Sequence, residues 1–184
     1  GAHRLLTNRL AQAAVIQTTA RSILEEGLAY DRCLVGVVTD MQGWESLADH
    51  DVQDISHMRR VLRTQIDVVL DEGAGVLNAD DERVAELASL CDGEVLLYSL
   101  HANNATIAAH RNEKNGRAVF LLDGRVVLAH GSKERVLGHL SALSLASGTA
   151  PDTASLLAAI ATAWALDIAP HLIAAGIKTF EYQR

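Results

Sequence analysis

The sequence is poor in aromatic residues, which make up 4% of its 184 positions. Two tryptophans, three tyrosines and two phenylalanines are too few to fill a core, although hydrophobic residues reach 49%. The interior must therefore be built from Ala, Leu, Val and Ile, which suits small-residue helices packed closely on β-branched strands. A chain of this length can bury one sizeable core, so we expect a single α/β domain.

Long apolar runs and basic charge are also scarce. No apolar run approaches the roughly 18 residues that a membrane span needs, and the first residues lack the pattern of a signal peptide. Twenty-three acidic against sixteen basic residues give a net charge of −7, which disfavours non-specific binding to nucleic acid. We expect a soluble, cytoplasmic protein that binds neither nucleic acid nor membrane.

The motifs of several common chemistries are missing. The two cysteines, Cys33 and Cys91, are far apart in the sequence and are interpreted as reduced, partly buried thiols. The eight histidines never recur at helical spacing, so a metal site built from two histidines on one helix is unsupported. The sequence contains neither the phosphate-binding Gly-x-x-x-x-Gly-Lys-Ser/Thr loop nor a Gly-x-Ser-x-Gly nucleophile elbow.

Continuous apolar runs alternate with amphipathic stretches through the first hundred residues. Such runs predict buried strands, and the periodic stretches between them predict helices. Strands are expected over residues 13–16, 34–38 and 94–98 and from 76 onward, and helices over 1–10, 19–27, 55–70 and 84–90. This alternation predicts right-handed crossovers and a parallel sheet that is covered on both faces.

The pattern changes after about residue 100. Asp123-Gly124 between two apolar runs is a strong signal for a type I′ hairpin. The hairpin strands are expected over 117–122 and 125–130, and two closing helices from 151 through 164 and from 170 to about 176. We accordingly divide the single expected domain into a parallel α/β part (1–100), a β-hairpin part (101–148) and C-terminal helices (149–184).

Polar clusters follow three of the expected strands, at 17–22, 39–51 and 78–81. Ligands of parallel α/β sheets bind outside the carboxyl ends of the strands, where these clusters should meet. In Asn78-Ala79-Asp80-Asp81, an amide and a carboxylate could hydrogen-bond a base and ribose hydroxyls. The alternative is structural, with one aspartate capping the next helix and Asn78 ordering the turn. The pattern leaves both interpretations open.

The cluster at 39–51 is rich in acidic residues. Asp40, Glu45, Asp49, His50 and Asp51 could form a metal site or an acid–base site. Solvated carboxylates and helix caps are the simpler interpretation, because acidic side chains are mostly exposed.

Several segments, taken in order, are similar to one known family. They are residues 13–18 with 23–33, 35–39, 76–81, 116–120 and 157–166. Together they resemble the Mur-ligase-like ATP-binding region of cyanophycin synthetase, and the resemblance covers nearly the whole chain.

The resemblance implies a three-layer α/β fragment with a mainly parallel sheet plus a β-hairpin, the distal portion of the family's central domain. The family is an ATP-dependent ligase that phosphorylates an aspartate carboxylate, using ATP and Mg²⁺, and lets an arginine amine attack the acyl phosphate. In this sequence the resemblance places Asn78, Asp80 and Asp81 at the nucleotide. It also places the start of the chain after the family's P-loop, and its end before the family's final domain.

The sequence departs from the family pattern at the positions expected to hold magnesium. Gln17 stands where the family has a magnesium-binding glutamate, and an amide is a weaker ligand for a hard cation. Asp40 and Glu45 replace the family's residues after the next strand. A family lysine and a family asparagine fall at Leu62 and Ser155. These combined changes predict that the chain alone neither hydrolyses ATP nor transfers phosphate from it.

Two hypotheses remain. The chain is either a piece of a cyanophycin-synthetase-like ligase, inactive when isolated, or a degenerate ligase domain that serves as an oligomerisation or interaction scaffold. Its partner would be a second copy or a complete synthetase. If nothing covers the apolar residues 13–16, an apolar patch results, so we expect self-association.

Overall fold

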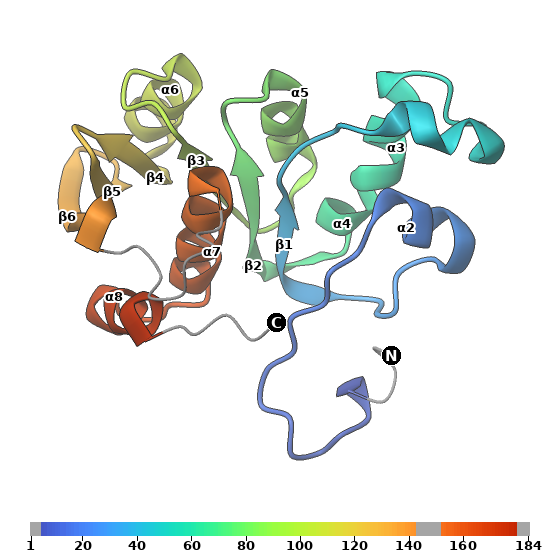
Figure 1. Ribbon diagram of the computed structural model, residues 1–184, viewed down its shortest axis with the longest axis horizontal. Helices are drawn as coiled ribbons and strands as arrows, with labels where there is room; N and C mark the ends of the chain where they lie inside the picture. The colour runs from blue at the N-terminus through green and yellow to red at the C-terminus, as the bar shows by residue number, and fades with distance from the viewer. Residues whose placement is uncertain (1–4, 143–151, 180–184) are drawn as a thin grey trace.

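A single six-stranded sheet organises the computed structural model, which describes residues 5–142 and 152–179 (Figure 1). The strand order follows the sequence from β1 to β6; β1 to β4 are parallel, whereas β4, β5 and β6 pair antiparallel. The strands are β1 (Cys33–Val38), β2 (Val69–Asn78), β3 (Glu94–Ser99), β4 (Arg117–Leu122), β5 (Arg125–His130) and β6 (Lys133–His139). The predicted α/β class, a mainly parallel sheet with an antiparallel hairpin, is thereby confirmed.

Helices cover both faces of the sheet. On one face lie α2 (Ala20–Glu26), α3 (Ile55–Leu62), α4 (Thr64–Asp67), α5 (Glu82–Ala85) and α6 (Ala105–Lys114), and on the other α7 (Thr153–Ala165) and α8 (Pro170–Thr179). Three short 3-10 turns are η1 (Trp44–His50), η2 (Glu86–Leu90) and η3 (Leu140–Ala142). Because side chains alternate along a strand, Leu97 packs into the first core whereas Leu96 and Tyr98 pack into the second.

The helix expected over residues 55–70 is wrong in its last part. The chain is helical in α3 and α4, but Val69 and Leu70 already belong to β2. The glycines at 73 and 75, which follow the expected helix in the sequence, lie inside that strand. A Cβ on Gly73 would lie 2.3 Å from the carbonyl oxygen of Leu34, so glycine here permits close approach of two backbones.

The strand expected over residues 13–16 is wrong as well, because these residues lie outside every strand and Val15 is 91% exposed. Of the helix expected over 1–10, only Leu5 and Leu6 are helical, and residues 1–4 lie outside the described residues. Among the α-helices and strands, α6 and β6 were not predicted. Asn104 is the N-cap of α6, and its side-chain oxygen accepts from Ile107 N at 3.1 Å.

The hairpin and the closing helices agree with expectation. Asp123 and Gly124 both have positive φ, +50° and +72°, as a type I′ turn requires. The helix α7 begins after its N-cap, Asp152, and Pro151 lies outside the described residues. Among the helices in the described part of the chain, none is long and apolar enough to cross a membrane.

Candidate functional site

Asn78 is the last residue of β2 and lies at the carboxyl edge of the parallel strands. Its Nδ2 donates to the carbonyl oxygen of Thr39 at 2.9 Å, which joins the ends of β1 and β2. Its Oδ1 accepts from Asp80 N at 3.0 Å. Both amide atoms therefore hold the turn in place, as the structural alternative for this segment expects.

Asp80 connects the end of β2 to the end of β3. Its Oδ1 accepts from Ser99 Oγ at 2.5 Å and from Asn104 Nδ2 at 3.1 Å, and its Oδ2 accepts from Leu100 N at 2.7 Å. Ser99 is completely buried, so Asp80 satisfies a hydroxyl that water cannot reach. The carboxylate thus fixes the relative position of two strands and of the N-terminus of α6.

Asp81 is the N-cap of α5 and also pairs with Arg83. Its Oδ1 accepts from Arg83 N at 3.1 Å, and the guanidinium donates through Nε at 2.9 Å and Nη2 at 3.0 Å. The Arg83 side chain lowers the pKa of Asp81 below its ordinary value, whereas partial burial works in the opposite direction. The Asp81 carboxylate is therefore ionised at neutral pH.

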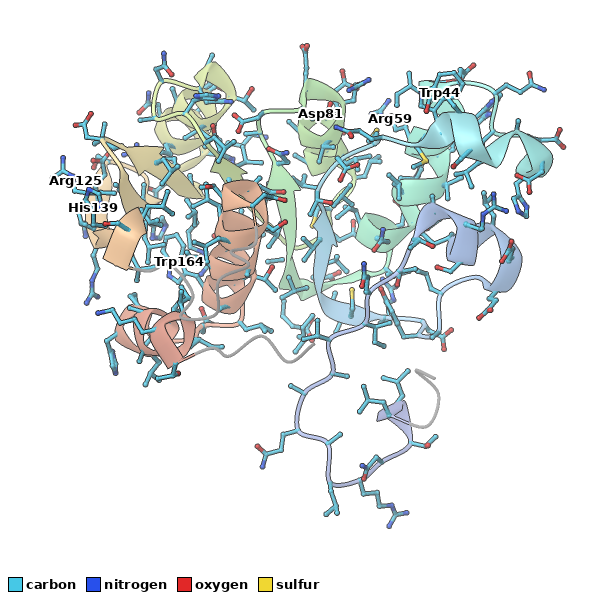
Figure 2. The ribbon with its side chains drawn as sticks, viewed as in Figure 1. Trp44, Arg59, Asp81, Arg125, His139 and Trp164 are labelled. Atoms are coloured by element: carbon cyan, nitrogen blue, oxygen red, sulfur yellow. The ribbon has the colours of Figure 1, made fainter. Side chains whose placement is uncertain are left out.

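These residues line an open depression of about 500 Å³ at the carboxyl edge of the sheet. Figure 2 shows Asp81 there, beside α5. The lining contains the carboxylates of Asp40, Asp80, Asp81 and Glu82 but a single guanidinium, that of Arg83, which Asp81 already neutralises. The net field is negative, so the depression disfavours phosphate groups and favours hydroxyl, amide or amine donors.

Tyr98 lies at the same end of β3 but on the other face of the sheet. Burial raises the pKa of Tyr98 far above its ordinary value, and the carboxylates of Asp40, Asp152 and Asp80 raise it further. Asp152 caps α7 by accepting from Ser155 N at 2.8 Å. Carboxylates from the ends of two strands and from the start of α7 thus all act to keep this phenol neutral.

The structure does not bring together Gln17, Asp40 and Glu45, the three positions that the family resemblance relates to magnesium. Asp40 lines the depression, and its oxygens accept from Gln42 N and Thr39 Oγ1, each at 3.0 Å. Gln17 lies in the exposed segment before α2, Glu45 lies in the first turn of η1, and neither lines the depression. Over residues 5–142 and 152–179, no three His, Cys, Asp or Glu side chains gather so as to hold a metal. This donor set does not fit Mg²⁺, which prefers an octahedral set of oxygen ligands.

The acidic residues of η1 are tied to α2 instead. Arg21 donates to Asp49 Oδ2 at 2.9 Å and to the carbonyl oxygen of Ser46 at 2.7 Å. His50 Nε2 lies 3.2 Å from Glu25 Oε1. The hydrogen bond from Arg21 lowers the pKa of Asp49. This exposed network positions α2 against η1.

Sequence reasoning missed the donors that surround Asp80. Ser99 and Asn104 come from 19 and 24 positions further along the chain, and short-range patterns do not connect such residues. One signal was present for Asn104, because asparagine directly before a helical stretch is a favoured N-cap. Arg83 could have been found as a basic residue two positions after a capping aspartate.

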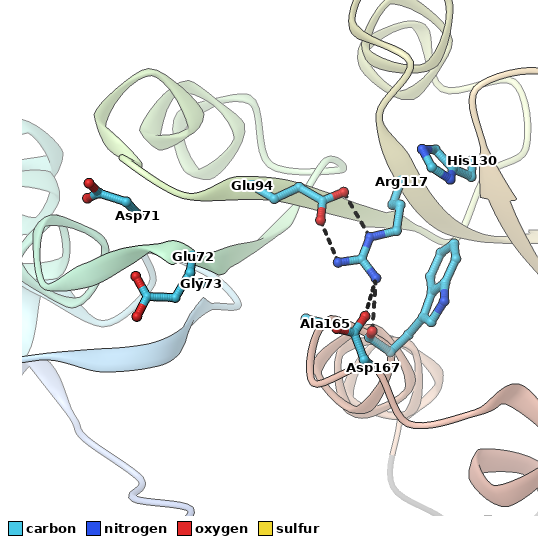
Figure 3. A pocket seen from close by; sticks show the side chains of 9 residues that line it. Asp71, Glu72, Gly73, Glu94, Arg117, His130, Ala165 and Asp167 are labelled. Carbon is cyan, nitrogen blue, oxygen red and sulfur yellow. Dashed lines mark hydrogen bonds and ion pairs between the residues drawn. The ribbon is translucent and has the colours of Figure 1, made fainter.

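A second cavity of about 470 Å³ lies at the amino ends of the strands (Figure 3). Arg117 fills its centre, donating to Glu94 Oε1 at 2.8 Å and to the carbonyl oxygen of Trp164 at 3.0 Å. The guanidinium also lies 5.2 Å from the centre of the Trp164 ring, and 3.6 Å from Asp167. With its donors engaged in this way, Arg117 attaches α7 to β3 and β4.

Comparison with known proteins identifies related sequences. No protein-family model matches the chain. The chain is 32% identical over 182 residues to the cyanophycin synthetase of Synechocystis sp., and 31% identical over 183 residues to that of Crocosphaera subtropica. Each match covers 96% of this chain and 20% of the synthetase. The synthetase of Nostoc sp. is 27% identical, again over 20% of its length. The chain thus spans about a fifth of the length of these relatives, and the resemblance to a segment of the synthetase is confirmed.

Proposed function

Because the chain is homologous to one segment of cyanophycin synthetase, we propose that it is part of an ATP-dependent amino-acid ligase that forms amide bonds through an acyl phosphate. The observation that carries this proposal is the match over 96% of the chain. We propose further that residues 1–184 form one Mur-ligase-like domain fragment, whose reaction needs segments outside this sequence. The unpaired thiols of Cys33 and Cys91 suit a reducing compartment, so we place it in the cytoplasm.

Within that ligase, we propose that Asn78, Asp80 and Asp81 contact the nucleoside part of ATP. Their oxygens already accept hydrogen bonds within the protein, but a carboxylate has about four lone-pair positions. Ribose hydroxyls can therefore still donate to them. The negative potential of the depression argues against binding the phosphates or transferring one of them, and so does the lack of a magnesium-binding donor set among the residues that the structure describes. We therefore expect weak binding that is independent of magnesium, and no turnover by this chain alone.

Calorimetric titration tests this proposal with adenosine and with ATP, each in the presence and absence of magnesium. Adenosine should bind at least as tightly as ATP, and magnesium should not change the affinity for adenosine. Phosphate release from ATP, measured in parallel, should stay at the uncatalysed rate. Tight magnesium-dependent binding or measurable turnover would overturn the proposed inactivity, whereas failure to bind adenosine would overturn the assignment of residues 78–81.

A matched pair of variants locates the binding. Glu82→Gln removes one carboxylate from the depression, so ATP should bind about threefold more tightly while adenosine binding changes little. Glu26→Gln removes an exposed charge at the end of α2 and should leave both affinities unchanged. Equal responses of the two variants would contradict binding in the depression.

A scaffold is the second candidate function. It is favoured by the apolar residues 13–16, which lie outside the sheet, and by the internal hydrogen bonds that occupy the carboxylates of Asp80 and Asp81. Such a scaffold would bind a second copy or a complete synthetase and would not bind adenosine. One experiment distinguishes the two candidates. The chain is added to a complete synthetase, and both its co-sedimentation with the synthetase and the turnover of the mixture are measured.

A further inference from the structure

The outer edge of β1 is open in the described part of the chain. β1 is the terminal strand of the sheet, and only β2 pairs with it. Its sequence, Cys-Leu-Val-Gly-Val-Val, carries no charge and no proline, the features that usually protect an edge strand. Its pairing with β2 is irregular near Cys33 but regular from Val35 to the end of the strand, and Leu34 is 52% exposed. This edge therefore offers unprotected hydrogen-bonding groups to another strand.

The same chain carries a segment with complementary properties. Residues 13–16, Ala-Ala-Val-Ile, are uncharged and lie outside every strand. Val15 is 91% exposed, although valine favours a half-buried strand. Figure 1 shows these residues as part of an N-terminal arm, residues 5–17, that projects from the body of the protein below β1.

The arm is attached to the body at its last residues. Thr19 forms a capping box with Ser22, and the buried Ala20 anchors α2 in the core. The chain order is then residues 13–16, α2 and β1, with residues 17–32 between the two segments. That connection is long enough for a parallel crossover, which needs about a dozen residues or more. Parallel pairing of residues 13–16 with a β1 edge is therefore topologically allowed.

We propose that residues 13–16 of a second copy pair with the outer edge of β1, and that the exchange is reciprocal. We choose a second copy as the partner for two reasons. The arm does not pair with the β1 edge of its own chain, and residues 13–16 form the short, uncharged segment that such an edge can bind. Exchange of identical segments closes around a two-fold axis and needs no new surface. It would bury Val15 and Leu34, the most exposed apolar side chains of the two edges. The inference does not depend on the ligase proposal.

Sedimentation velocity over a wide concentration range tests the proposal with two variants. Val15→Lys places a charge in the proposed strand pair, whereas Leu10→Lys places one at a 90% exposed site of the same arm outside residues 13–16. Both positions are solvent-exposed, so neither variant should unfold the protein. The unmodified chain and Leu10→Lys should form dimers, and Val15→Lys should raise the dimer dissociation constant at least tenfold.

Hydrogen exchange locates the contact. Amides in residues 13–16 and along the outer edge of β1 should gain protection together, and only at concentrations where the dimer is populated. A chain that stays monomeric at every concentration overturns the proposal. So does a dimer that both lysine variants weaken equally or leave intact. Protection of residues 13–16 in the monomer would show pairing within one chain, which also rules out exchange.

Discussion

Asp80 shows how a residue that resembles a ligand-binding group can be part of the framework. Its two oxygens accept from a buried hydroxyl, a side-chain amide and a backbone amide, which come from three different residues after β2. The sequence places Asp80 correctly at a strand end, but it cannot show which donors the fold brings there. Asn78 and Asp81 follow the same rule, because a turn and a helix cap already engage their side chains.

Asp80→Asn tests this framework role. In this variant an amide nitrogen replaces one of the two carboxylate oxygens. The nitrogen then faces either the donors of Oδ1, which are Ser99 Oγ and Asn104 Nδ2, or the donor of Oδ2, which is Leu100 N. In both cases a donor loses its acceptor. We expect the free energy of unfolding in urea to fall by about 1–3 kcal/mol. Asp92→Asn is the same exchange at an exposed loop position and should change it by less than about 0.5 kcal/mol. Equal effects of the two variants would contradict a structural role for Asp80.

At the scale of elements, prediction succeeded where one local signal sufficed. β1, β3, the Asp123-Gly124 hairpin and α7 each have an apolar run or a turn motif that no neighbour overrides. It failed over residues 13–16, because an apolar run becomes a strand only when a neighbouring strand pairs with it. It also failed in β2, where Gly73 indicates close backbone packing and not the end of a helix. The same holds for the candidate site. The polar residues at the strand ends were predicted from local signals, whereas the donors that come from distant positions in the sequence were not.

His110 is one of the residues that attach the unpredicted helix α6 to the sheet. His110 Nε2 donates to the carbonyl oxygen of Val95 at 3.0 Å. Gly116 makes room for the imidazole, because a Cβ there would lie 2.0 Å from Nε2. Burial lowers the pKa of His110, and the hydrogen bond to Val95 only partly opposes this. The ring is therefore neutral in the folded protein at neutral pH.

Stability should consequently depend on pH through His110. The unfolded chain takes up a proton below about pH 6.5, while the folded chain resists it down to its lowered pKa. The unfolded state thus binds more protons in that window, so stability is complete above about pH 6.5 and falls as the pH drops below it. Urea unfolding of the unmodified chain and of His110→Gln, at a series of pH values from neutral to acidic, should show a weaker pH dependence in the variant. An unchanged dependence would contradict a titrating His110.

At the scale of the whole molecule, the two tryptophans report on opposite faces of the sheet. Trp44, at the start of η1, packs against the core that lies under α2, α3 and α6. Trp164 packs near the end of α7 and contacts Arg117. The strands between them contribute side chains to both cores, so neither core can lose its strands while the other stays intact. This shared sheet supports the proposal that the chain is one domain.

A single domain should unfold in one cooperative step. In Trp44→Phe, the remaining fluorescence comes from Trp164 on the α7 face, whereas far-ultraviolet circular dichroism averages over the whole fold. The two signals should give the same urea midpoint within one variant, and the same should hold in Trp164→Phe. Comparison within each variant removes the effect of the substitution on stability. The contrary result is a fluorescence midpoint below the circular-dichroism midpoint in only one of the two variants. It would show that the face carrying the remaining tryptophan unfolds separately, and that the chain consists of two folding units.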